Sequence, residues 1–263
     1  MTTILETKNL EMKFGAVYAA KDVNISIASG EVMGVIGSNG AGKTTFVNMV
    51  TGYLTPTSGE IIYRGKSITG KATRDITRLG ICRSFQIPQL FPELPVIENV
   101  LIALTISKQD KPVLFKPAID RSLEEEAHKL LARFDIDQYA DQEIQTLPQG
   151  VRKLVDIAMA TVAEPDLLFL DEPTSGVSAD EKMDFMRILI DALKTTDTAV
   201  LFIEHDMEIV EAFSPRCVAF YEGTILADGP TAEVLENDKV REFVIGSEFH
   251  REAAKETSKE GAI

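Results

Sequence analysis

A glycine-rich segment, residues 37–44, matches the pattern G-x-x-x-x-G-K-[ST] and lies between the apolar run Val32 to Ile36 and a helix-like run from Thr45. A phosphate-binding P-loop needs this context, because tight glycine turns let several backbone N–H groups point at one phosphate and the following helix adds its positive end. The lysine would reach the β and γ phosphates, and the next hydroxyl would ligate Mg²⁺. The alternative is a glycine turn that only joins a strand to a helix. We predict that the phosphates are bound by Gly37, Ser38, Asn39, Gly40, Ala41, Gly42, Lys43, Thr44 and Thr45.

Two adjacent carboxylates, Asp171 and Glu172, follow the apolar run Leu167 to Leu170. Phosphoryl transfer needs a carboxylate at a strand end to hold Mg²⁺, and a base or water-positioning group beside it. We assign the first role to Asp171 and the second to Glu172. Strand ends often carry acidic residues that merely face solvent, and the Asp-Glu pair alone favours that interpretation. The P-loop upstream in the same chain reverses the preference.

The elements that must position these residues begin with a β-rich first third. Apolar and polar residues alternate in Ile4 to Met12 and in Val23 to Ile27, and Glu31 to Ile36 is the strand that leads into the P-loop. A helix is expected from Lys43 to about Thr51, and a short strand over Ile61 to Lys66.

From about Pro95 to Ala163 the apolar spacing becomes helical, which indicates a helical insertion. After Pro165 the pattern returns to alternating strands and helices, with a final hairpin around Glu222-Gly223 and a polar tail over residues 247–263, which is either a frayed surface helix or disordered. The expected elements are strands at Asp166 to Leu170 and Ala199 to Ile203, helices at Ala179 to Lys194 and Met207 to Phe213, and the hairpin at Cys217 to Ala227.

Length and composition limit the possible classes. At 263 residues the chain suits one large α/β domain, or such a core with one inserted subdomain. A charge of −14, from 27 basic and 41 acidic residues, argues against nucleic acid as the main partner. The two cysteines, Cys82 and Cys217, have no metal-ligand spacing and are expected to be reduced and buried. We expect a soluble chain, because no signal peptide or membrane-spanning run is present and any membrane role would need a partner.

Five motifs in order make the chain resemble the ATP-binding subunits of ABC transporters, over nearly its whole length to about Gly246. The motifs are the P-loop, Arg83-Ser84-Phe85-Gln86, the signature-like Leu147-Pro148-Gln149-Gly150-Val151, the strand Leu167 to Glu172, and Ile203-Glu204-His205-Asp206.

The resemblance implies an α/β fold with a P-loop NTPase (RecA-like) core, an N-terminal antiparallel β subdomain and an inserted helical subdomain at about 87–163, all within an ATPase domain of residues 1–246. It implies ATP and Mg²⁺ as cofactors. Gln86 would contact Mg²⁺ and the attacking water, His205 the γ phosphate, and Phe14 the adenine ring. Taken alone, Phe14 would be assigned to the core, Gln86 to the surface and His205 to an ordinary strand end.

Within the family, Arg83 to Pro92 and Val96 to Val100 are similar to the ATPases of high-affinity branched-chain amino acid importers, as is the ending Gly229 to Val234. Similar endings occur in lipopolysaccharide-export ATPases. The resemblance implies transmembrane permease subunits, a second ATPase subunit and, indirectly, a periplasmic binding protein as partners, with no nucleic acid. The chain would lie peripherally at the cytoplasmic face of the inner membrane.

Two segments depart from the family pattern. The usual signature Leu-Ser-Gly-Gly-Gln, which binds the γ phosphate held by the partner subunit, keeps only Leu147 and Gly150 here. Pro148 supplies neither a hydroxyl nor a backbone N–H, although it suits the start of a helix that continues through Met159. Ser178 stands where most members have aspartate. These departures put in doubt the contacts of Leu147, Pro148, Gln149 and Gly150 with the neighbour's ATP.

The resulting mechanism has Glu172 orienting or deprotonating water for in-line attack, with Lys43, Mg²⁺ and His205 stabilising the developing charge. Closure of a head-to-tail dimer would move the insertion between Gln86 and Gln149, and residues 86–94 would face the permease. Two rivals remain: a weakly hydrolysing regulatory partner of a sister ATPase, and a soluble ABC protein of translation or DNA repair, which usually has two cassettes or a long coiled coil.

Overall fold

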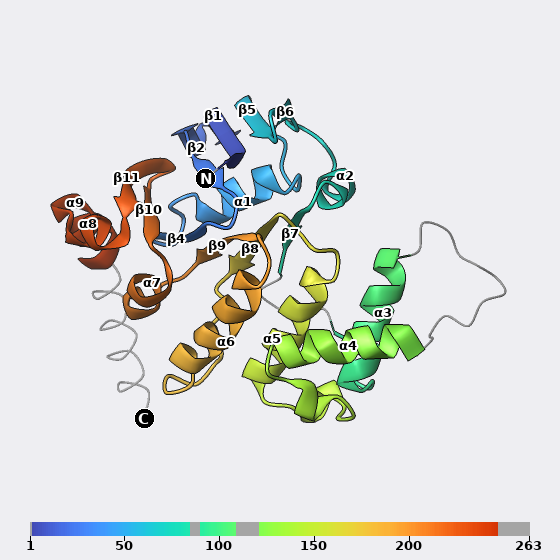
Figure 1. Cartoon of the computed structure of the whole chain (residues 1–263). Helices are drawn as coiled ribbons and strands as arrows, with labels where there is room; N and C mark the ends of the chain where they lie inside the picture. The colour runs from blue at the N-terminus through green and yellow to red at the C-terminus, as the bar shows by residue number, and fades with distance from the viewer. Residues whose placement is uncertain (1, 85–89, 109–120, 247–263) are drawn as a thin grey trace. The chain divides into compact units, whose positions relative to one another are not determined.

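The computed structural model describes residues 2–84, 90–108 and 121–246, which form two compact units (Figure 1). The P-loop unit comprises Met1–Leu79 and Ala199–Ile263, and the helical unit comprises Gly80–Thr198. In the parts of the chain so described, no helix is both long enough and apolar enough to cross a membrane.

The P-loop unit contains an antiparallel sheet in the order β2-β1-β5-β6, with β3 also paired to β1. Apolar side chains of its strands, among them Leu5, Leu10 and Ile61, are buried. The strands are β1 (Thr3–Phe14), β2 (Val17–Val23), β3 (Ser26–Ala28), β5 (Ser58–Tyr63) and β6 (Lys66–Ser67).

A second sheet of the same unit has the order β11-β10-β4-β9. Strand β4 pairs in parallel with both β10 and β9, whereas β10 and β11 form an antiparallel hairpin. Strands β4 and β9 are apolar almost throughout, as is usual for parallel strands that are covered on both faces. The strands are β4 (Val32–Gly37), β9 (Ala199–Ile203), β10 (Arg216–Tyr221) and β11 (Thr224–Pro230), and the helices are α1 (Lys43–Val50), α2 (Thr73–Arg78), α7 (Met207–Phe213), α8 (Thr231–Glu236), α9 (Asp238–Val240) and the π-helix η3 (Arg241–Ile245).

In the helical unit, β7 and β8 pair in parallel, and the three helices α3, α4 and α5 come between them in the sequence. These helices pack against one another around side chains such as Val100, Leu131 and Leu154, so the helical insertion is confirmed. The elements are β7 (Ile81–Arg83), α3 (Val96–Lys108), α4 (Arg121–Arg133), α5 (Gln149–Thr161), β8 (Leu167–Asp171), α6 (Lys182–Lys194) and the 3₁₀ turns η1 (Asp137–Tyr139) and η2 (Ile144–Thr146).

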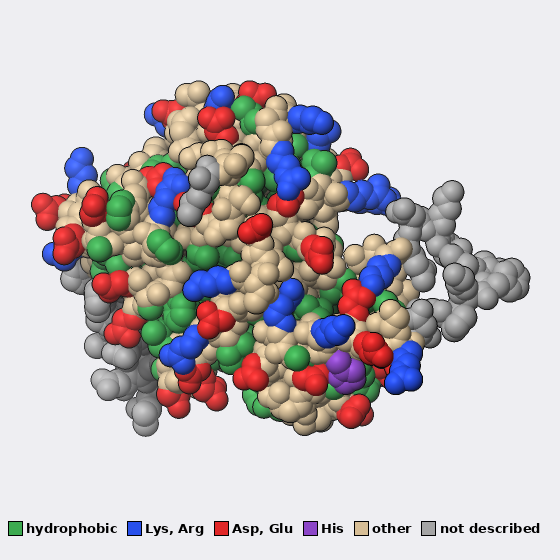
Figure 2. Space-filling view, viewed as in Figure 1, with side chains coloured by type: hydrophobic (Ala, Val, Ile, Leu, Met, Phe, Trp, Pro, Cys, Tyr) green, Lys and Arg blue, Asp and Glu red, His purple; other side chains and the backbone are tan. Residues whose placement is uncertain are grey.

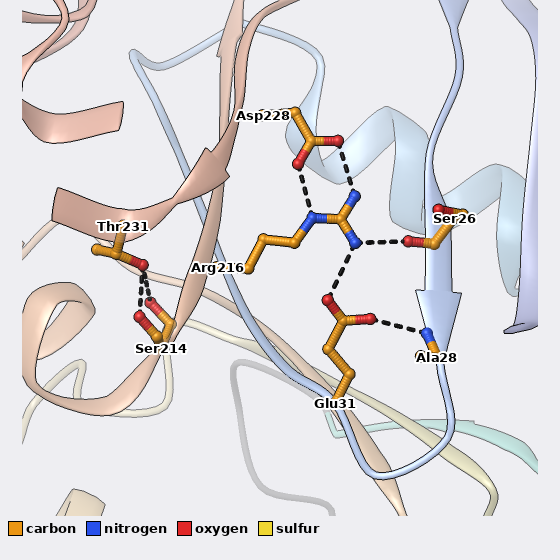
Figure 3. Close-up of polar contacts among 7 residues, drawn as sticks. All are labelled: Ser26, Ala28, Glu31, Ser214, Arg216, Asp228 and Thr231. Carbon is orange, nitrogen blue, oxygen red and sulfur yellow. Dashed lines mark hydrogen bonds and ion pairs between the residues drawn. The ribbon is translucent and has the colours of Figure 1, made fainter. Parts of the chain in front are cut away.

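Charged side chains of both signs are interspersed over the face shown in Figure 2. One partly exposed polar cluster ties several strands of the P-loop unit together (Figure 3). Arg216 donates from Nε and Nη2 to the Asp228 carboxylate at 2.7 and 2.8 Å, and from Nη1 to Ser26 O and Glu31 Oε1 at 2.8 and 3.0 Å. The second Glu31 oxygen accepts from Ala28 N at 2.7 Å. The hydrogen bonds to Asp228 raise the pKa of Arg216, so this cluster keeps its charge.

Most expected elements are present, including α7 at the predicted residues and the hairpin whose turn residues Glu222 and Gly223 both have positive φ. The single strand expected over Val23 to Ile27 is wrong: β2 ends at Val23 and β3 begins at Ser26. The Thr7 hydroxyl causes this break, because it donates to Val23 O at 3.2 Å and accepts from Ile25 N at 2.9 Å.

Other boundaries were also missed. The helix expected from Ala179 begins at Lys182, since Ser178 instead forms a turn whose carbonyl accepts the N–H of Glu181. The sequence prediction missed α2 and β7, which are short or strongly polar, and β2, whose apolar and polar residues do not alternate. The polar tail over residues 247–263 lies outside the described residues.

Candidate nucleotide-binding site

The P-loop connects β4 to α1 as predicted, and its glycines are required by the backbone. Gly37, Gly40 and Gly42 have φ values of 152°, 85° and 104°. A Cβ added at Gly37 would lie 2.5 Å from Phe220 O, and one added at Gly42 would lie 2.4 Å from Ala19 O. Only glycine combines these torsions with such close backbone approaches.

Neighbouring strands hold the loop in place through backbone hydrogen bonds. The turn residue Gly223 donates to Ala41 O at 2.9 Å and accepts from Lys21 N at 2.7 Å. Within the loop, Ala41 N donates to Ser38 O at 3.0 Å. The P-loop is therefore joined to β2 and to the turn between β10 and β11.

Lys43, the first residue of α1, is 6% exposed, and its ammonium group lies inside the curve of the loop. Its Nζ donates to Gly37 O and, at 3.2 Å, to Ser38 O. Thr44 next to it is exposed, and no side chain in the described parts of the chain caps the start of α1 at Gly42. A helix start that no side chain caps suits an anion, because its first N–H groups find no partner within the helix.

His205 lies at the same edge of the sheet as the P-loop. Val35 of β4 pairs with Ile203 of β9, and Glu204 N donates to Val35 O at 3.3 Å. Because parallel strands end at one edge, the residue that follows β9 is brought to the side on which the P-loop begins. The structure therefore places the loop and this histidine at the same edge of the sheet.

Phe14 ends β1, opposite Val17 of β2, and is 52% exposed. The core position that its residue type alone favours is wrong. Tyr18 on the same hairpin is 42% exposed, with Lys13 Nζ at 5.1 Å from its ring centroid. An exposed aromatic ring here is available for stacking on a planar ligand.

In the helical unit, β8 carries Asp171 to its end, where Arg83 of β7 meets it. Arg83 Nη2 donates to Asp171 Oδ2 at 2.6 Å, and the two side chains are 14% and 11% exposed. The pairing of β7 with β8 continues to Ser84, whose N–H donates to Phe169 O at 2.9 Å. Glu172 follows with φ at 48°, a left-handed conformation that is uncommon for glutamate.

The signature-like segment forms the start of α5. Leu147 is buried, and Pro148 has φ −56° and ψ 152° immediately before the helix, which confirms its expected helix-opening position. Gln149 is exposed, and a Cβ added at Gly176 would lie 2.1 Å from its Nε2. Gly150 is half-buried beside Val177.

Three observations concern the expected metal. Thr44 and Asp171, two of the predicted ligands, carry side-chain oxygen atoms, the donor type that Mg²⁺ prefers. No group of three or more His, Cys, Asp or Glu occurs in the described residues, so the carboxylates there do not form a cage of their own. Gln86, the third predicted ligand, lies outside the described residues.

The predicted site residues that the structure describes belong to both units. Phe14, the P-loop and His205 are in the P-loop unit, and residues 147–150, Asp171 and Glu172 are in the helical unit.

Two residues in this site carry no role in the sequence analysis. Arg83 begins the motif Arg83-Ser84-Phe85-Gln86, but the sequence analysis assigned no function to it. The structure shows its ion pair with Asp171. Lys153 is 5% exposed, and its Nζ donates to Glu172 O and Pro173 O at 2.9 and 3.1 Å. The sequence does contain a sign that Lys153 is buried. It lies four residues before Ile157, and residues at this spacing share one face of a helix, here the apolar face of α5.

Comparison with known proteins agrees with this geometry. Residues 20–175 match the ABC transporter family. A probable branched-chain amino acid transport ATP-binding protein of Archaeoglobus fulgidus is 35% identical over 251 residues, which cover 93% of this chain and 96% of the relative. The high-affinity branched-chain amino acid transport ATP-binding protein of Escherichia coli K12 is 34% identical, with 92% and 98% covered.

Solved structures give the same result. Two crystal structures of ATP-binding cassettes from ABC transporters, one nucleotide-free and one in an ADP conformation, align with TM-scores of 0.80 and 0.81. Their sequence identities are 30% and 31%, and each alignment covers 92% of this chain and 98% of the other.

The chain belongs to the ABC transporter family and is an ATP-binding cassette with ATPase chemistry. The predicted fold, a P-loop NTPase core with an antiparallel β subdomain and inserted helices, is confirmed. More particularly, it is a nucleotide-binding subunit homologous to the ATP-binding proteins of branched-chain amino acid transport.

Proposed function

We propose that this chain hydrolyses ATP to drive import of branched-chain amino acids or similar small polar solutes. The observation that carries the ATPase part is the P-loop, in which Gly37 and Gly42 permit the backbone approach and Lys43 is buried inside the curve. The cargo rests on likeness over at least 92% of the chain to ATP-binding proteins of that transport class.

In the proposed binding mode, N–H groups of residues 37–45 and Lys43 hold the phosphates, and the exposed ring of Phe14 stacks on adenine. Thr44, Asp171 and Gln86 are the residues that would hold Mg²⁺. The bound ion would neutralise charge on the phosphate oxygens and on the leaving group.

Hydrolysis then proceeds by in-line attack of water on the γ phosphorus, with ADP as the leaving group. Glu172 orients this water and takes its proton. Lys43 and His205 donate to the γ-phosphate oxygens as their charge develops.

The proposed assembly is a head-to-tail dimer with a second, identical or related ATPase subunit, in which Leu147, Pro148, Gln149 and Gly150 of one subunit approach the other's ATP. The ATPase domain spans residues 1–246, with a helical subdomain at about 87–163 and the polar tail at 247–263. Closure moves the segment between Gln86 and Gln149, and permease subunits at the cytoplasmic face of the inner membrane receive that motion near residues 86–94. A periplasmic binding protein would deliver the solute.

The substitution Glu172→Gln tests the ATPase part. It should leave ATP binding intact and lower turnover by about 100-fold or more, since a general base typically contributes that factor. A nucleotide-dependent dimer should then accumulate in Mg·ATP, as measured by light scattering. Turnover at the wild-type rate would remove Glu172 from its role.

Transport assays test the cargo. In vesicles that contain the chain with its permease subunits, ATP-dependent uptake of labelled leucine should exceed that of an unrelated solute. Extraction of lipopolysaccharide instead would favour an export ATPase.

One observation favours a second candidate, a weakly hydrolysing partner of a more active sister subunit. Pro148 precedes α5 where the family signature has serine, so this position offers the neighbour's ATP neither a hydroxyl nor an N–H. The steady-state rate of ATP hydrolysis, measured for the chain alone and together with its sister subunit, decides between the two candidates. The sites of a regulatory partner would hydrolyse ATP slowly under both conditions.

A further inference from the structure

We propose that Lys153 is a positioning residue that sets the backbone of Glu172 and thereby aims its carboxylate. This inference rests on the proposed role of Glu172 as the base. Lys153 Nζ donates to Glu172 O at 2.9 Å and to Pro173 O at 3.1 Å. Its side chain comes from the second turn of α5, so a helix, and not the loop itself, supplies the contact.

Burial makes this contact costly to lose. Lys153 is 5% exposed, and lysine is among the residues least often buried, because an ammonium taken out of water must be compensated by strong acceptors. Hydrogen bonds from a charged donor are stronger than those between neutral groups. Two successive carbonyl groups are therefore held in one direction by a single charged atom.

The backbone that these bonds hold is an unfavourable one. Glu172 has φ at 48°, and Pro173 after it disfavours the ordinary helical conformation at Glu172. Glu172 O also accepts from Ser175 N at 3.0 Å, which closes a turn. Since φ and ψ fix the direction of the Cα–Cβ bond, fixing this carbonyl fixes where the Glu172 carboxylate can reach.

The same helix supports the rest of this turn. The side chain of Gln149, the first residue of α5, occupies the space beside Gly176. A Cβ added at Gly150 would lie 3.8 Å from the side chain of Val177. The segment from Glu172 to Val177 therefore lies against the first turns of α5. A shift of the signature-like start of this helix would be transmitted through Lys153 to the base.

The variant Lys153→Met removes the donors and keeps the length of the side chain, whereas Lys153→Arg keeps charged donors. Lys129, an exposed lysine of α4, provides the matched control Lys129→Met. For each purified chain we would measure single-turnover hydrolysis with the chain in excess over Mg·ATP, the Kd for ATP by calorimetry, and equilibrium unfolding. If Lys153→Met does not fold, Lys153→Gln, which removes the charge and shortens the side chain, replaces it, and the same results support or overturn the proposal.

Lys153→Met should hydrolyse at least tenfold more slowly with its Kd for ATP within twofold of wild type. Lys153→Arg should recover most of the rate, and Lys129→Met should match wild type. Added to Glu172→Gln, Lys153→Met should cause little further loss, because it acts through the residue already removed.

Three results overturn the proposal: unchanged hydrolysis in Lys153→Met, a loss that appears only in ATP affinity, or losses that multiply in the double variant. A wild-type rate in Glu172→Gln alone would instead refute the proposed base. The two failures are therefore distinguishable.

Discussion

Replacing Arg83 by methionine would leave the Asp171 carboxylate without its ion-pair partner at the end of β8. The two side chains are 14% and 11% exposed and meet at 2.6 Å. They also connect the last residues of two paired strands, so the change affects the strand end from which Glu172 follows. We expect Arg83→Met to destabilise the nucleotide-free chain.

The magnitude follows from burial. Breaking a buried ion pair by removing one partner costs about 3–5 kcal/mol, because the remaining charge loses its compensation. Both groups here keep slight contact with solvent, so the lower value, about 3 kcal/mol, is expected. At roughly 2–4 °C per kcal/mol this lowers the Tm by roughly 6–12 °C.

Thermal unfolding followed by circular dichroism, without nucleotide or Mg²⁺, measures this change. The wild type, Arg83→Met, Asp171→Asn and the double variant complete a double-mutant cycle. Asp171→Asn removes the stranded charge, so the double variant should be more stable than Arg83→Met, with a coupling free energy of about 1 kcal/mol or more.

The reasoning fails if Arg83→Met unfolds within 1 °C of the wild type. It fails equally if the effects of the two substitutions are additive, since the ion pair would then contribute nothing. Arg83→Lys, which keeps the charge without the planar fork, should lie between the wild type and Arg83→Met.

Three further predictions concern the P-loop unit. Lys43→Ala should weaken ATP binding about 10- to 100-fold in calorimetry, as expected for the loss of one charge-assisted contact, with an unchanged circular dichroism spectrum. Arg216→Leu should cost about 2 kcal/mol in urea unfolding, between the values for exposed and buried pairs, and Asp228→Asn in that background should restore part of it. Burial raises the pKa of the Cys217 thiol to about 12, so the native chain at pH 8 should react with a thiol reagent far more slowly at this residue than the urea-unfolded chain.

Sequence patterns predicted the long or strongly periodic elements. The apolar strand before the P-loop, the helix from Lys43 and the helix Met207 to Phe213 all have enough apolar residues at one period to define them. The break between β2 and β3 was missed, because a side chain from another strand, the Thr7 hydroxyl, takes over the backbone partners there. Domain bounds and catalytic roles stay predictions.

The sequence by itself determined the chemistry of the P-loop, because the spacing of Gly37, Gly42 and Lys43 along one chain already specifies a loop whose amides face a phosphate. It also determined that Pro148 opens a helix, since its ring fixes φ. Only the tertiary structure decided that Arg83 pairs with Asp171 and that Lys153 holds the carbonyl of Glu172. The first pair is separated by 88 residues and the second by 19, and such contacts depend on which strands and helices pack together, which no local periodicity records.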